Sequence, residues 1–327
     1  MTNSVEMNMI QSLNQALDLH LKNQPKSLIL GEDIGQFGGV FRVTEGLMKK
    51  YGSDRVVDTP LSECGLTGTA IGLALGGLRP IVEIQFADFV FPGINQIINE
   101  MAKYRYRSGG QYQLPIVVRM PYGGGIRGGH YHSQSPEVFF AHTPGLRVIV
   151  PSGPYEAKGL LLAALNCHDP VIFMEPKLVY RSKKDQVPQG YYTLPLDQSH
   201  LLSEGDDATI IAYGAMTHVA MEVAEMAKTD GYAIDVIDLL SLVPLDRDQI
   251  IRSVQKTGRL VVVHEAPQTA GFGAEIVSMV QENCFDYLQA PIRRVTGFDT
   301  PFPYILEAHY LPSKARVYHA LKEVICY

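Results

Sequence analysis

Two patterns of apolar and polar positions alternate along most of the chain. Apolar residues at helical spacing indicate amphipathic helices, and short continuous apolar runs that end in polar residues or glycine indicate buried strands. In the first half, helices are predicted at 10–21 and from 65, 91 and 155, and strands at 28–30, near 56, and at 80–86, 115–118, 147–150 and 171–174. Strands that alternate with helices are typical of a parallel sheet covered by helices on both faces.

The pattern stops between Val179 and Gly205, where the chain is polar and contains prolines, and a linker is predicted there. It then resumes, with strands predicted at 208–213, 233–239 and 260–264, helices from 217, 246 and 274, and a final helix before Tyr327. The pattern therefore predicts an α/β domain over 1–178, a linker over 179–205 and a smaller α/β domain over 206–327.

The amino-acid composition and net charge disfavour some classes of binding partner. Of the 327 residues, 46% are hydrophobic and 19% are charged, which is typical of a globular protein. The net charge of -6, without a long cluster of Lys and Arg, gives no electrostatic reason to expect a nucleic acid or an anionic membrane as partner. The apolar run 65–78 is too short to cross a bilayer.

Cysteine usage and the first residues predict a cytoplasmic protein. Four cysteines lie far apart and form no C-x-x-C pair, so reduced thiols are expected. The opening MTNSVEMNMIQSLNQ has neither the order of a secretion signal nor the arginines of a transit peptide.

The segment MPYGGGIRGGHYHSQSPE, 120–137, follows a predicted strand and combines a run of glycines with His130 and His132. Glycines let a backbone approach a ligand closely, and a histidine can carry a proton near neutral pH. The segment is either a flexible surface loop or a catalytic loop at the carboxyl end of a strand.

Two other interpretations of this loop are disfavoured. Gly123, Gly125 and Gly128 fit G-x-G-x-x-G, but HYHSQSP follows where a dinucleotide site needs an apolar helix start. His130 and His132 could both bind a metal, but no further Cys, His or carboxylate ligands cluster with them at the required spacing.

Glu63 is the strongest candidate among the carboxylates, because it stands between a predicted strand and a glycine-rich helix. Partial burial there would raise its pKa and suit it to proton exchange. Alternatively, it is an acid favoured by the helix dipole. Gly68, Gly72 and Gly76 recur every four residues on the same helix, which indicates a close helix interface.

Six segments resemble one family: LGEDIGQFGGVFRVTEGL, DTPLSECGLTGTAIGLAL, RPIVEIQFADFVFPGINQI, YHSQSPEVFFAHTPGL, HEAPQTAGFGAEI and GFDTPFPYILE. They span nearly the whole chain and resemble the β subunit of the E1 component of 2-oxo acid dehydrogenase complexes. YHSQSPE, FDTPFPYI and the closing Cys326 and Tyr327 are most similar to the branched-chain (2-oxoisovalerate) enzymes, with the pyruvate and acetoin enzymes as near relatives. The resemblance implies a thiamine-diphosphate-binding, pyrimidine-type parallel-sheet domain followed by a smaller transketolase C-terminal-like α/β domain.

The resemblance also implies that thiamine diphosphate is shared with a second subunit. Enzymes that hold its diphosphate through magnesium carry a G-D-G motif and a later asparagine. The nearest string here, Gly205-Asp206-Asp207, departs from that motif. We therefore expect the diphosphate and magnesium to be held by an E1 α subunit in an α2β2 assembly, with the active site where the chains meet.

Site residues follow from the resemblance position by position. Glu63 would hydrogen-bond a ring nitrogen of the aminopyrimidine and so promote loss of the thiazolium proton, which gives the nucleophilic form of the cofactor. Leu61, Gln85 and Phe89 match positions around the same ring. Phe89 stands where relatives often have tyrosine, so it can stack but cannot donate a hydrogen bond.

His132 matches the family histidine of the HSQ string, whereas His130 matches no family residue. We expect His132 to donate a proton when the acyl group moves to the lipoyl group of the E2 acyltransferase, because a dithiolane sulfur then leaves as a thiol. His130 is expected to cap or orient the loop.

Some relatives hold a structural potassium ion in this subunit. The matching positions are Ile116, Ala164, Leu165, Cys167 and Asp169. Main-chain carbonyls could still bind the ion here, but Cys167 replaces an acid and Asp169 replaces an amide, whereas a hard cation prefers oxygen ligands.

The implied reaction is the oxidative decarboxylation of a small branched-chain 2-oxo acid with reductive acylation of E2. The alternatives are a pyruvate or acetoin dehydrogenase β subunit and a non-catalytic E2-docking subunit. A transketolase or deoxyxylulose-phosphate synthase fragment is a further alternative, but those enzymes carry the diphosphate module on the same chain. Glu63 and His132 together favour the catalytic interpretation.

Overall fold

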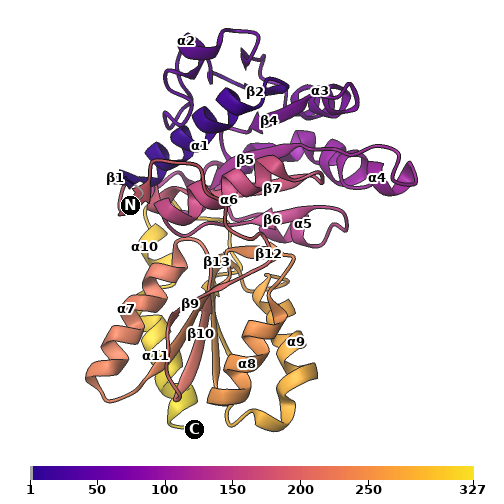
Figure 1. Ribbon diagram of the computed structural model, residues 1–327. Coiled ribbons are helices and arrows are strands. Elements are labelled where there is room, and N and C mark those ends of the chain that lie inside the picture. Colours follow the sequence, from indigo (N-terminus) through magenta and orange to yellow (C-terminus); the bar gives the residue numbers. More distant parts are fainter. Residues whose placement is uncertain (1–2) are drawn as a thin grey trace.

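Two α/β units, each built on its own sheet, lie one above the other (Figure 1). The computed structural model describes residues 3–327, so the first two residues of the expected first domain lie outside it. The upper unit contains nearly all of the first half of the chain, and the lower unit contains the orange and yellow second half.

The upper sheet has seven strands in the order β12-β6-β7-β5-β4-β2-β3. All neighbouring strands are parallel except β12 and β6, which agrees with the expected parallel sheet. The strands from the first half are β2 (Ser27–Gly31), β3 (Val56–Asp58), β4 (Arg79–Glu83), β5 (Val117–Tyr122), β6 (Arg147–Ile149) and β7 (Val171–Pro176).

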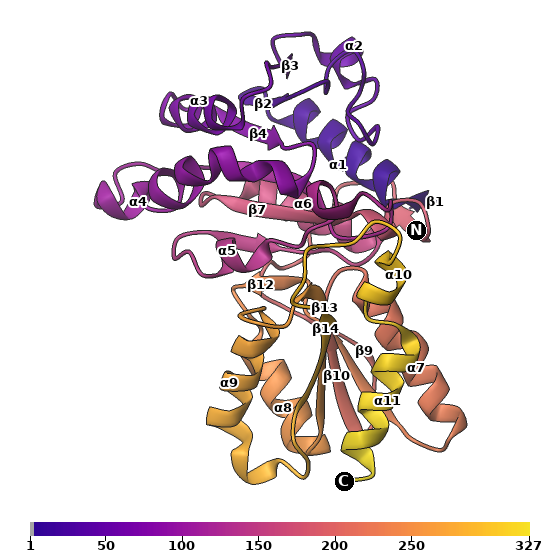
Figure 2. The same ribbon diagram turned by 180° about the vertical axis from the view of Figure 1, so that it is seen from behind.

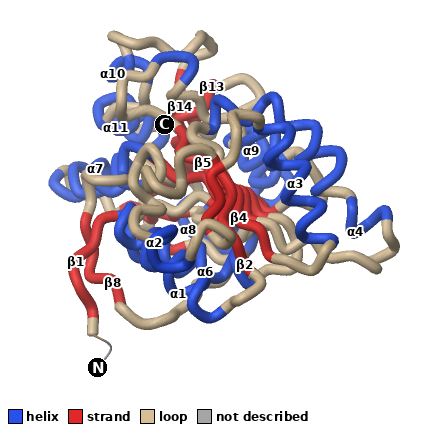
Figure 3. The backbone as a smooth tube through the Cα atoms, turned by 90° about the horizontal axis from the view of Figure 1, so that it is seen from above, coloured by secondary structure: helices blue, strands red, loops and turns tan. Residues whose placement is uncertain are grey.

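Helices cover both faces of this sheet. On one face lie α1 (Met9–Asn23) and α6 (Pro154–Asn166), and on the other lies α3 (Glu63–Leu75), as the view from above shows (Figure 3). Neighbouring strand residues serve opposite faces, since Val117 packs in the core with α1 and Val118 packs in the core with α3. The short helix α2 (Leu47–Tyr51) lies beside β3.

The region after β4 differs from the regular helix expected from residue 91. It contains a 3-10 helix (Ala87–Gly93), a π-helix (Gln96–Met101) and the short helix α4 (Tyr104–Arg107). Pro92 lies inside the 3-10 helix and has no N–H to donate, which disfavours a continuous α-helix there. A 3-10 turn (Gly129–Tyr131) and α5 (Glu137–Ala141) follow β5.

The expected linker is more structured than its polar sequence indicated. It begins at the end of a 3-10 turn (Lys177–Val179) and contains β8 (Lys184–Pro188), which pairs antiparallel with β1 (Ser4–Asn8) at the start of the chain. Near its end lies β9 (His200–Ser203), an edge strand of the second sheet.

The lower sheet has five strands in the order β14-β13-β10-β11-β9, and only the edge strand β9 is antiparallel to its neighbour. Its other strands are β10 (Ala208–Ala212), β11 (Ile234–Asp238), β13 (Leu260–Pro267) and β14 (Arg293–Gly297). Its helices are α7 (Met216–Thr229), α8 (Arg247–Thr257), α9 (Gly273–Cys284), a 3-10 turn (Phe285–Tyr287), α10 (Glu307–Tyr310) and α11 (Lys314–Ile325). Figure 2 shows α8 and α9 on one side of this sheet and α7 and α11 on the other.

One strand crosses from the second half of the chain to the first sheet. β12 (Ser241–Val243) follows β11 but pairs antiparallel with β6, and Val150 donates its N–H to the Leu240 carbonyl at 2.8 Å. The two units therefore share backbone hydrogen bonds. Within residues 3–327, no helix is both long enough and apolar enough to cross a membrane.

Candidate active site

The carboxyl ends of the central parallel strands of the upper sheet lie at one edge, and the candidate residues follow those ends. Glu63 comes after β3, Gln85 and Phe89 come after β4, and the glycine-rich loop comes after β5. Ligands of open parallel sheets bind beyond this edge. The fold thus brings together residues that lie as much as 70 positions apart in the sequence.

Glu63 opens helix α3. Ser62 caps this helix by accepting the Gly65 N–H at 3.3 Å, and the helix dipole favours a carboxylate in this first turn. The residue as a whole is only 9% exposed, but its carboxyl oxygens accept no hydrogen bond within the described chain and reach the surface at this edge. Gly93 packs on its backbone so closely that a Cβ there would lie 2.8 Å from the Glu63 carbonyl oxygen.

Further acids make this edge electronegative. Burial raises the pKa of Glu32, and the neighbouring carboxylates of Glu63 and Asp33 raise it further. Gln85 donates a long hydrogen bond to Asp33, at 3.4 Å. A ligand group that offers hydrogen-bond donors or positive charge is favoured here over an anionic phosphate.

Leu61 and Phe89 supply apolar surface beside these acids. Leu61 is 80% exposed, and Phe89 is half-buried with its ring edge-on to Phe86, 5.5 Å between centroids. The 3-10 helix that carries Phe89 contacts α3 on one side and the turn before His132 on the other. The Phe89 ring itself contacts His132, and the helix that carries it joins the turn before His132 to α3.

The His132 ring is fixed by aromatic contacts. It stands perpendicular to Phe86 at 4.7 Å between centroids and nearly perpendicular to Phe89 at 5.3 Å. Such edge-to-face contacts restrict the orientation of the imidazole. The side chain is half-buried and lies on the same sheet edge as Glu63.

His130 behaves differently from His132. Its side chain is exposed, and its ring lies 4.0 Å from that of Tyr131 and 6.1 Å from that of Tyr304. Its carbonyl accepts a hydrogen bond from Gln134 at 2.7 Å, which closes the turn around His132. These contacts are those of a residue that shapes the loop.

Carboxylates from both domains hold the loop through its backbone. Glu265 accepts the Gly124 N–H at 2.9 Å, and Glu307 accepts those of Gly125 at 3.1 Å and Arg127 at 2.9 Å. The glycines suit this role because Gly125 has a φ of +110°, and a Cβ there would lie 2.9 Å from the Leu178 backbone. The second domain thereby fixes the first half of the loop.

Asp88 fixes the other end of the loop, and Lys177 supplies nearby positive charge. Asp88 accepts the Gln134 N–H at 3.0 Å. The Lys177 ammonium is buried 5.7 Å from the centre of the Phe86 ring and has no hydrogen-bond partner within residues 3–327. Burial lowers the pKa of Lys177 to about 8, an effect opposed by Asp88, Glu265 and Glu307.

Comparisons with known proteins decide the family. Residues 5–183 match the family Transketolase, pyrimidine binding domain, and residues 197–317 match Transketolase, C-terminal domain. The chain is 51% identical to the mitochondrial 2-oxoisovalerate dehydrogenase subunit beta of Dictyostelium discoideum, over 98% of this chain and 87% of the relative. It is 50% identical to 2-oxoisovalerate dehydrogenase subunit beta of Pseudomonas aeruginosa, over 98% and 95%. The chain belongs to the E1 β-subunit family of 2-oxo acid dehydrogenases.

Other members and a more distant structure are also similar. Pyruvate dehydrogenase E1 component subunit beta of Staphylococcus aureus (strain MW2) is 46% identical over 98% of this chain and 99% of the relative. A solved structure titled "Split gene transketolase, inactive beta4 tetramer" superposes with a TM-score of 0.78 over 98% of both chains, at 22% identity, which shows the fold alone. The expected fold class, a pyrimidine-type domain followed by a transketolase C-terminal-like domain, is confirmed.

The residues present fit the pyrimidine end of the cofactor that the family implies. Along this edge the chain offers a carboxylate without a protein partner, an amide and two apolar side chains, a combination that suits an aminopyrimidine ring. No cluster of three or more His, Cys, Asp or Glu suited to a metal ion occurs within residues 3–327.

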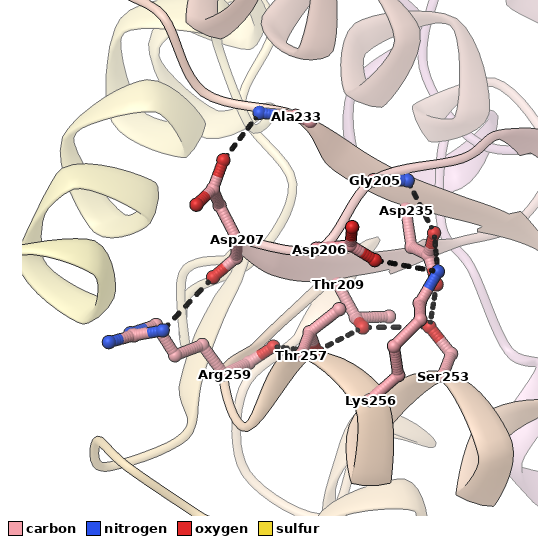
Figure 4. A network of polar contacts seen from close by, with 10 residues as sticks. All are labelled: Gly205, Asp206, Asp207, Thr209, Ala233, Asp235, Ser253, Lys256, Thr257 and Arg259. Carbon is pink, nitrogen blue, oxygen red and sulfur yellow. Dashed lines mark hydrogen bonds and ion pairs between the residues drawn. The ribbon is translucent and has the colours of Figure 1, made fainter.

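The string nearest to a diphosphate motif has a structural role in this member of the family (Figure 4). Gly205 donates to Asp235 at 2.8 Å, Asp207 accepts the Ala233 N–H at 2.7 Å, and Asp206 lies 3.8 Å from the Lys256 ammonium. These groups lie at the amino ends of β10 and β11, away from Glu63 and His132. They do not form a phosphate site for this active centre.

The positions expected to bind potassium do not fit that ion in this chain. The Leu165 and Cys167 carbonyls already accept hydrogen bonds from the Arg79 guanidinium, both at 2.8 Å. The Asp169 carboxylate forms an ion pair with Arg105 at 2.5 Å. The family resemblance indicated oxygen ligands at these positions. It could not show that the Arg79 guanidinium already binds two of those oxygens.

Several supporting residues escaped the sequence analysis. Phe86, Glu265 and Glu307 contact His132 or the backbone of its loop, although Glu265 and Glu307 come from the second domain. The family segments HEAPQTAGFGAEI and GFDTPFPYILE contain these two acids, so the signal was present. Their contact with the loop could not be recognised from the sequence because it joins residues more than 140 positions apart.

Proposed function

We propose that this chain is the β subunit of a thiamine-diphosphate-dependent E1 enzyme that oxidatively decarboxylates branched-chain 2-oxo acids and acylates the lipoyl group of E2. An α subunit completes the site and holds the magnesium and the diphosphate. The observation that carries this proposal is the placement of Glu63, buried and without a partner in the chain, on the same edge as a fixed His132.

Glu63 is the proton-controlling residue in this proposal. When bound, thiamine diphosphate supplies the electron sink for decarboxylation. The Glu63 carboxylate holds a proton at a ring nitrogen of the pyrimidine, and the first turn of α3 stabilises its negative charge. Phe89 and Leu61 would supply apolar surface beside the bound ring.

His132 is the proton donor for acyl transfer. Its ring is held edge-on to Phe86 and Phe89, so a proton on the imidazole is presented in one direction. The dithiolane sulfur that leaves during reductive acylation requires a proton, and a positioned imidazolium lowers the barrier of that step.

The substrate proposal rests on similarity within the family. Relatives at 50–51% identity are named 2-oxoisovalerate dehydrogenase β subunits, and relatives at 46% are named pyruvate dehydrogenase β subunits. We therefore propose a branched-chain substrate, with pyruvate as the alternative. Comparing kcat/KM for 2-oxoisovalerate and pyruvate in the reconstituted enzyme decides between them.

An exposed apolar surface supports the α2β2 assembly. Around the loop, Ile126 is 42% exposed, Tyr131 61% and Ile305 90%. Apolar side chains gathered beside a site indicate a surface that a partner covers. We assign this surface to the α subunit, and we place the complex with its E2 partner in the cytoplasm, where the four free cysteines stay reduced.

Substitution of His132 tests the catalytic proposal. In the reconstituted α and β pair, His132→Ala should lower acylation of a lipoyl domain by about 10²-fold or more. Decarboxylation measured with an artificial electron acceptor should change far less, because that assay needs no proton for a leaving sulfur.

His130→Ala is the matched control, since it removes an imidazole two residues away from the same loop. It should retain most of both activities. Equal losses of His132→Ala in the two assays would contradict the assigned role. Full activity of both variants would show that neither imidazole takes part in catalysis.

A further inference from the structure

The five positions that could be expected to bind potassium lie on the sheet edge opposite the active site. They surround the end of α6 and the amino ends of β5 and β7: Ile116, Ala164, Leu165, Cys167 and Asp169. Glu63 and His132 follow the carboxyl ends of neighbouring strands. Any cation held at these five positions therefore serves the structure and not the reaction.

Arg79 reaches this place from a neighbouring strand. It is the first residue of β4 and is half-buried, and its Nη2 donates to the Leu165 and Cys167 carbonyls, both at 2.8 Å. Its Nε is buried without a hydrogen-bond partner in the part of the chain that the structure describes. The guanidinium is thus held by two main-chain oxygens.

Helix α6 needs a cation at this end. Its last carbonyls carry the negative end of the helix dipole, and its last turn contains no basic residue. Leu165 belongs to that turn, and Cys167 is the C-cap residue. Arg79 supplies from outside the helix the positive charge that the last turn of α6 lacks.

The remaining expected ligands also have protein partners. The Ile116 carbonyl accepts the Val171 N–H at 2.9 Å, and the Ala164 carbonyl accepts the Cys167 N–H at 3.0 Å. The Asp169 carboxylate is paired with Arg105. A potassium ion placed among these oxygens would stand beside a guanidinium of the same charge and would be repelled by it.

We propose that the Arg79 guanidinium permanently takes the place of the structural potassium ion, so that neither folding nor assembly of this chain depends on potassium. This inference is independent of the catalytic proposal, because it concerns the opposite edge of the sheet.

The test uses the purified full-length chain in the assembly that it forms. Thermal unfolding is followed in potassium chloride, sodium chloride and choline chloride at equal ionic strength, and bound potassium is measured by atomic emission after desalting. The wild-type Tm should be the same in the three salts, with no stoichiometric potassium. Saturable stabilisation by potassium alone, or one potassium ion per chain, would overturn the proposal.

Substitutions of Arg79 distinguish the effect of its positive charge on Tm from the effect of its side-chain packing. Arg79→Met keeps an unbranched stem but removes the cation, and should lower Tm by about 2–6 °C in every salt. Arg79→Lys keeps the charge and should retain more than half of that difference. Arg105→Met, which removes an exposed cation at the same sheet edge, is the matched control and should change Tm little.

An Arg79→Met chain as stable as the wild type would also overturn the proposal. If Arg79→Met does not fold, Arg79→Lys and the wild-type salt series still decide. A lysine variant that keeps most of the stability, with no effect of potassium on either protein, supports the replacement, and potassium stabilisation of both argues against it.

Discussion

Each domain buries one charged network, and the two networks lie at opposite ends of their strands. In the first domain, Arg119 is almost fully buried between Glu83 at 2.7 Å and Glu175 at 2.8 Å, toward the carboxyl ends of β4, β5 and β7. In the second domain, Asp235 accepts from Ser253 at 2.6 Å and Lys256 at 2.7 Å near the amino end of β11 (Figure 4).

Among the described residues, a series of side-chain contacts connects the first network, but not the second, to the active site. Tyr180 hydrogen-bonds to Glu175 at 2.5 Å, and its ring lies 5.1 Å from Phe41. Phe41 in turn lies 5.4 Å from Phe86, which contacts His132. The second network contacts neither His132 nor its loop. We therefore expect the first network to affect both stability and the active site, and the second to affect stability alone.

The largest effect is expected from Arg119→Met. This substitution leaves Glu83 and Glu175 buried without their cation, which should cost about 3–5 kcal/mol of unfolding free energy. Urea unfolding measures the loss, and the folded fraction should also lose lipoyl acylation. The loss should shrink as pH falls, because protonated carboxyls no longer need the guanidinium. A variant as stable and as active as the wild type would show that the Arg119 network supports neither folding nor catalysis.

A smaller effect is expected from Asp235→Asn. Asp235 accepts hydrogen bonds from Gly205, Ser253 and Lys256, so removal of its charge should cost about 1.5–3 kcal/mol. The kcat of the folded enzyme should stay unchanged, which urea unfolding and steady-state assays together can check. Asp206→Asn is the control, because its 87% exposed side chain lies 3.8 Å from the same lysine. A fall in kcat for Asp235→Asn would connect the second network to catalysis.

The smallest effect concerns the boundary between the domains. Glu137 accepts a hydrogen bond from Tyr213 at 2.7 Å, and burial raises the pKa of Glu137 to about 7. The folded state therefore holds a proton that the unfolded state releases at lower pH. This contribution is fully present below the unfolded pKa and is lost as pH rises through about 7, by about 1–2 kcal/mol between pH 5 and 7.

Glu137→Gln should remove this part of the pH dependence. Its amide oxygen still accepts from Tyr213 but does not titrate, so the difference in unfolding free energy between variant and wild type should change with pH in the predicted direction. Parallel pH profiles of the two proteins would show that Glu137 is already ionised at pH 5.

Local patterns predicted the fold wherever an element is defined by its own residues. The spacing of Ile10, Leu13 and Leu17 predicted α1, and the apolar runs predicted β2 to β7 of the first sheet and β10, β11 and β13 of the second, but not β9, β12 or β14. Pairings between distant segments were missed. β8 carries no alternating pattern and exists because β1 supplies its hydrogen bonds, and β12 is a three-residue strand completed by β6.

The candidate site was likewise predictable where the local sequence defines it, and not where it depends on contacts between distant segments. The density of glycines indicated the loop after β5, and the position of Glu63 before an apolar helix indicated an unusual carboxylate. Separation of His132 from His130 needed the family resemblance, because the residues themselves do not show which ring meets Phe86. The role of Arg79 depends on the Leu165 and Cys167 carbonyls, whose positions follow from packing alone.

The crossing of β12 has a consequence for how the molecule unfolds. Because a strand from the second half of the chain completes the sheet of the first, the domains cannot separate without breaking the backbone hydrogen bonds between Val150 and Leu240 and between β12 and β6. The chain should therefore denature in one cooperative transition. The Val150 amide should exchange its hydrogen as slowly as the amides of the central strands.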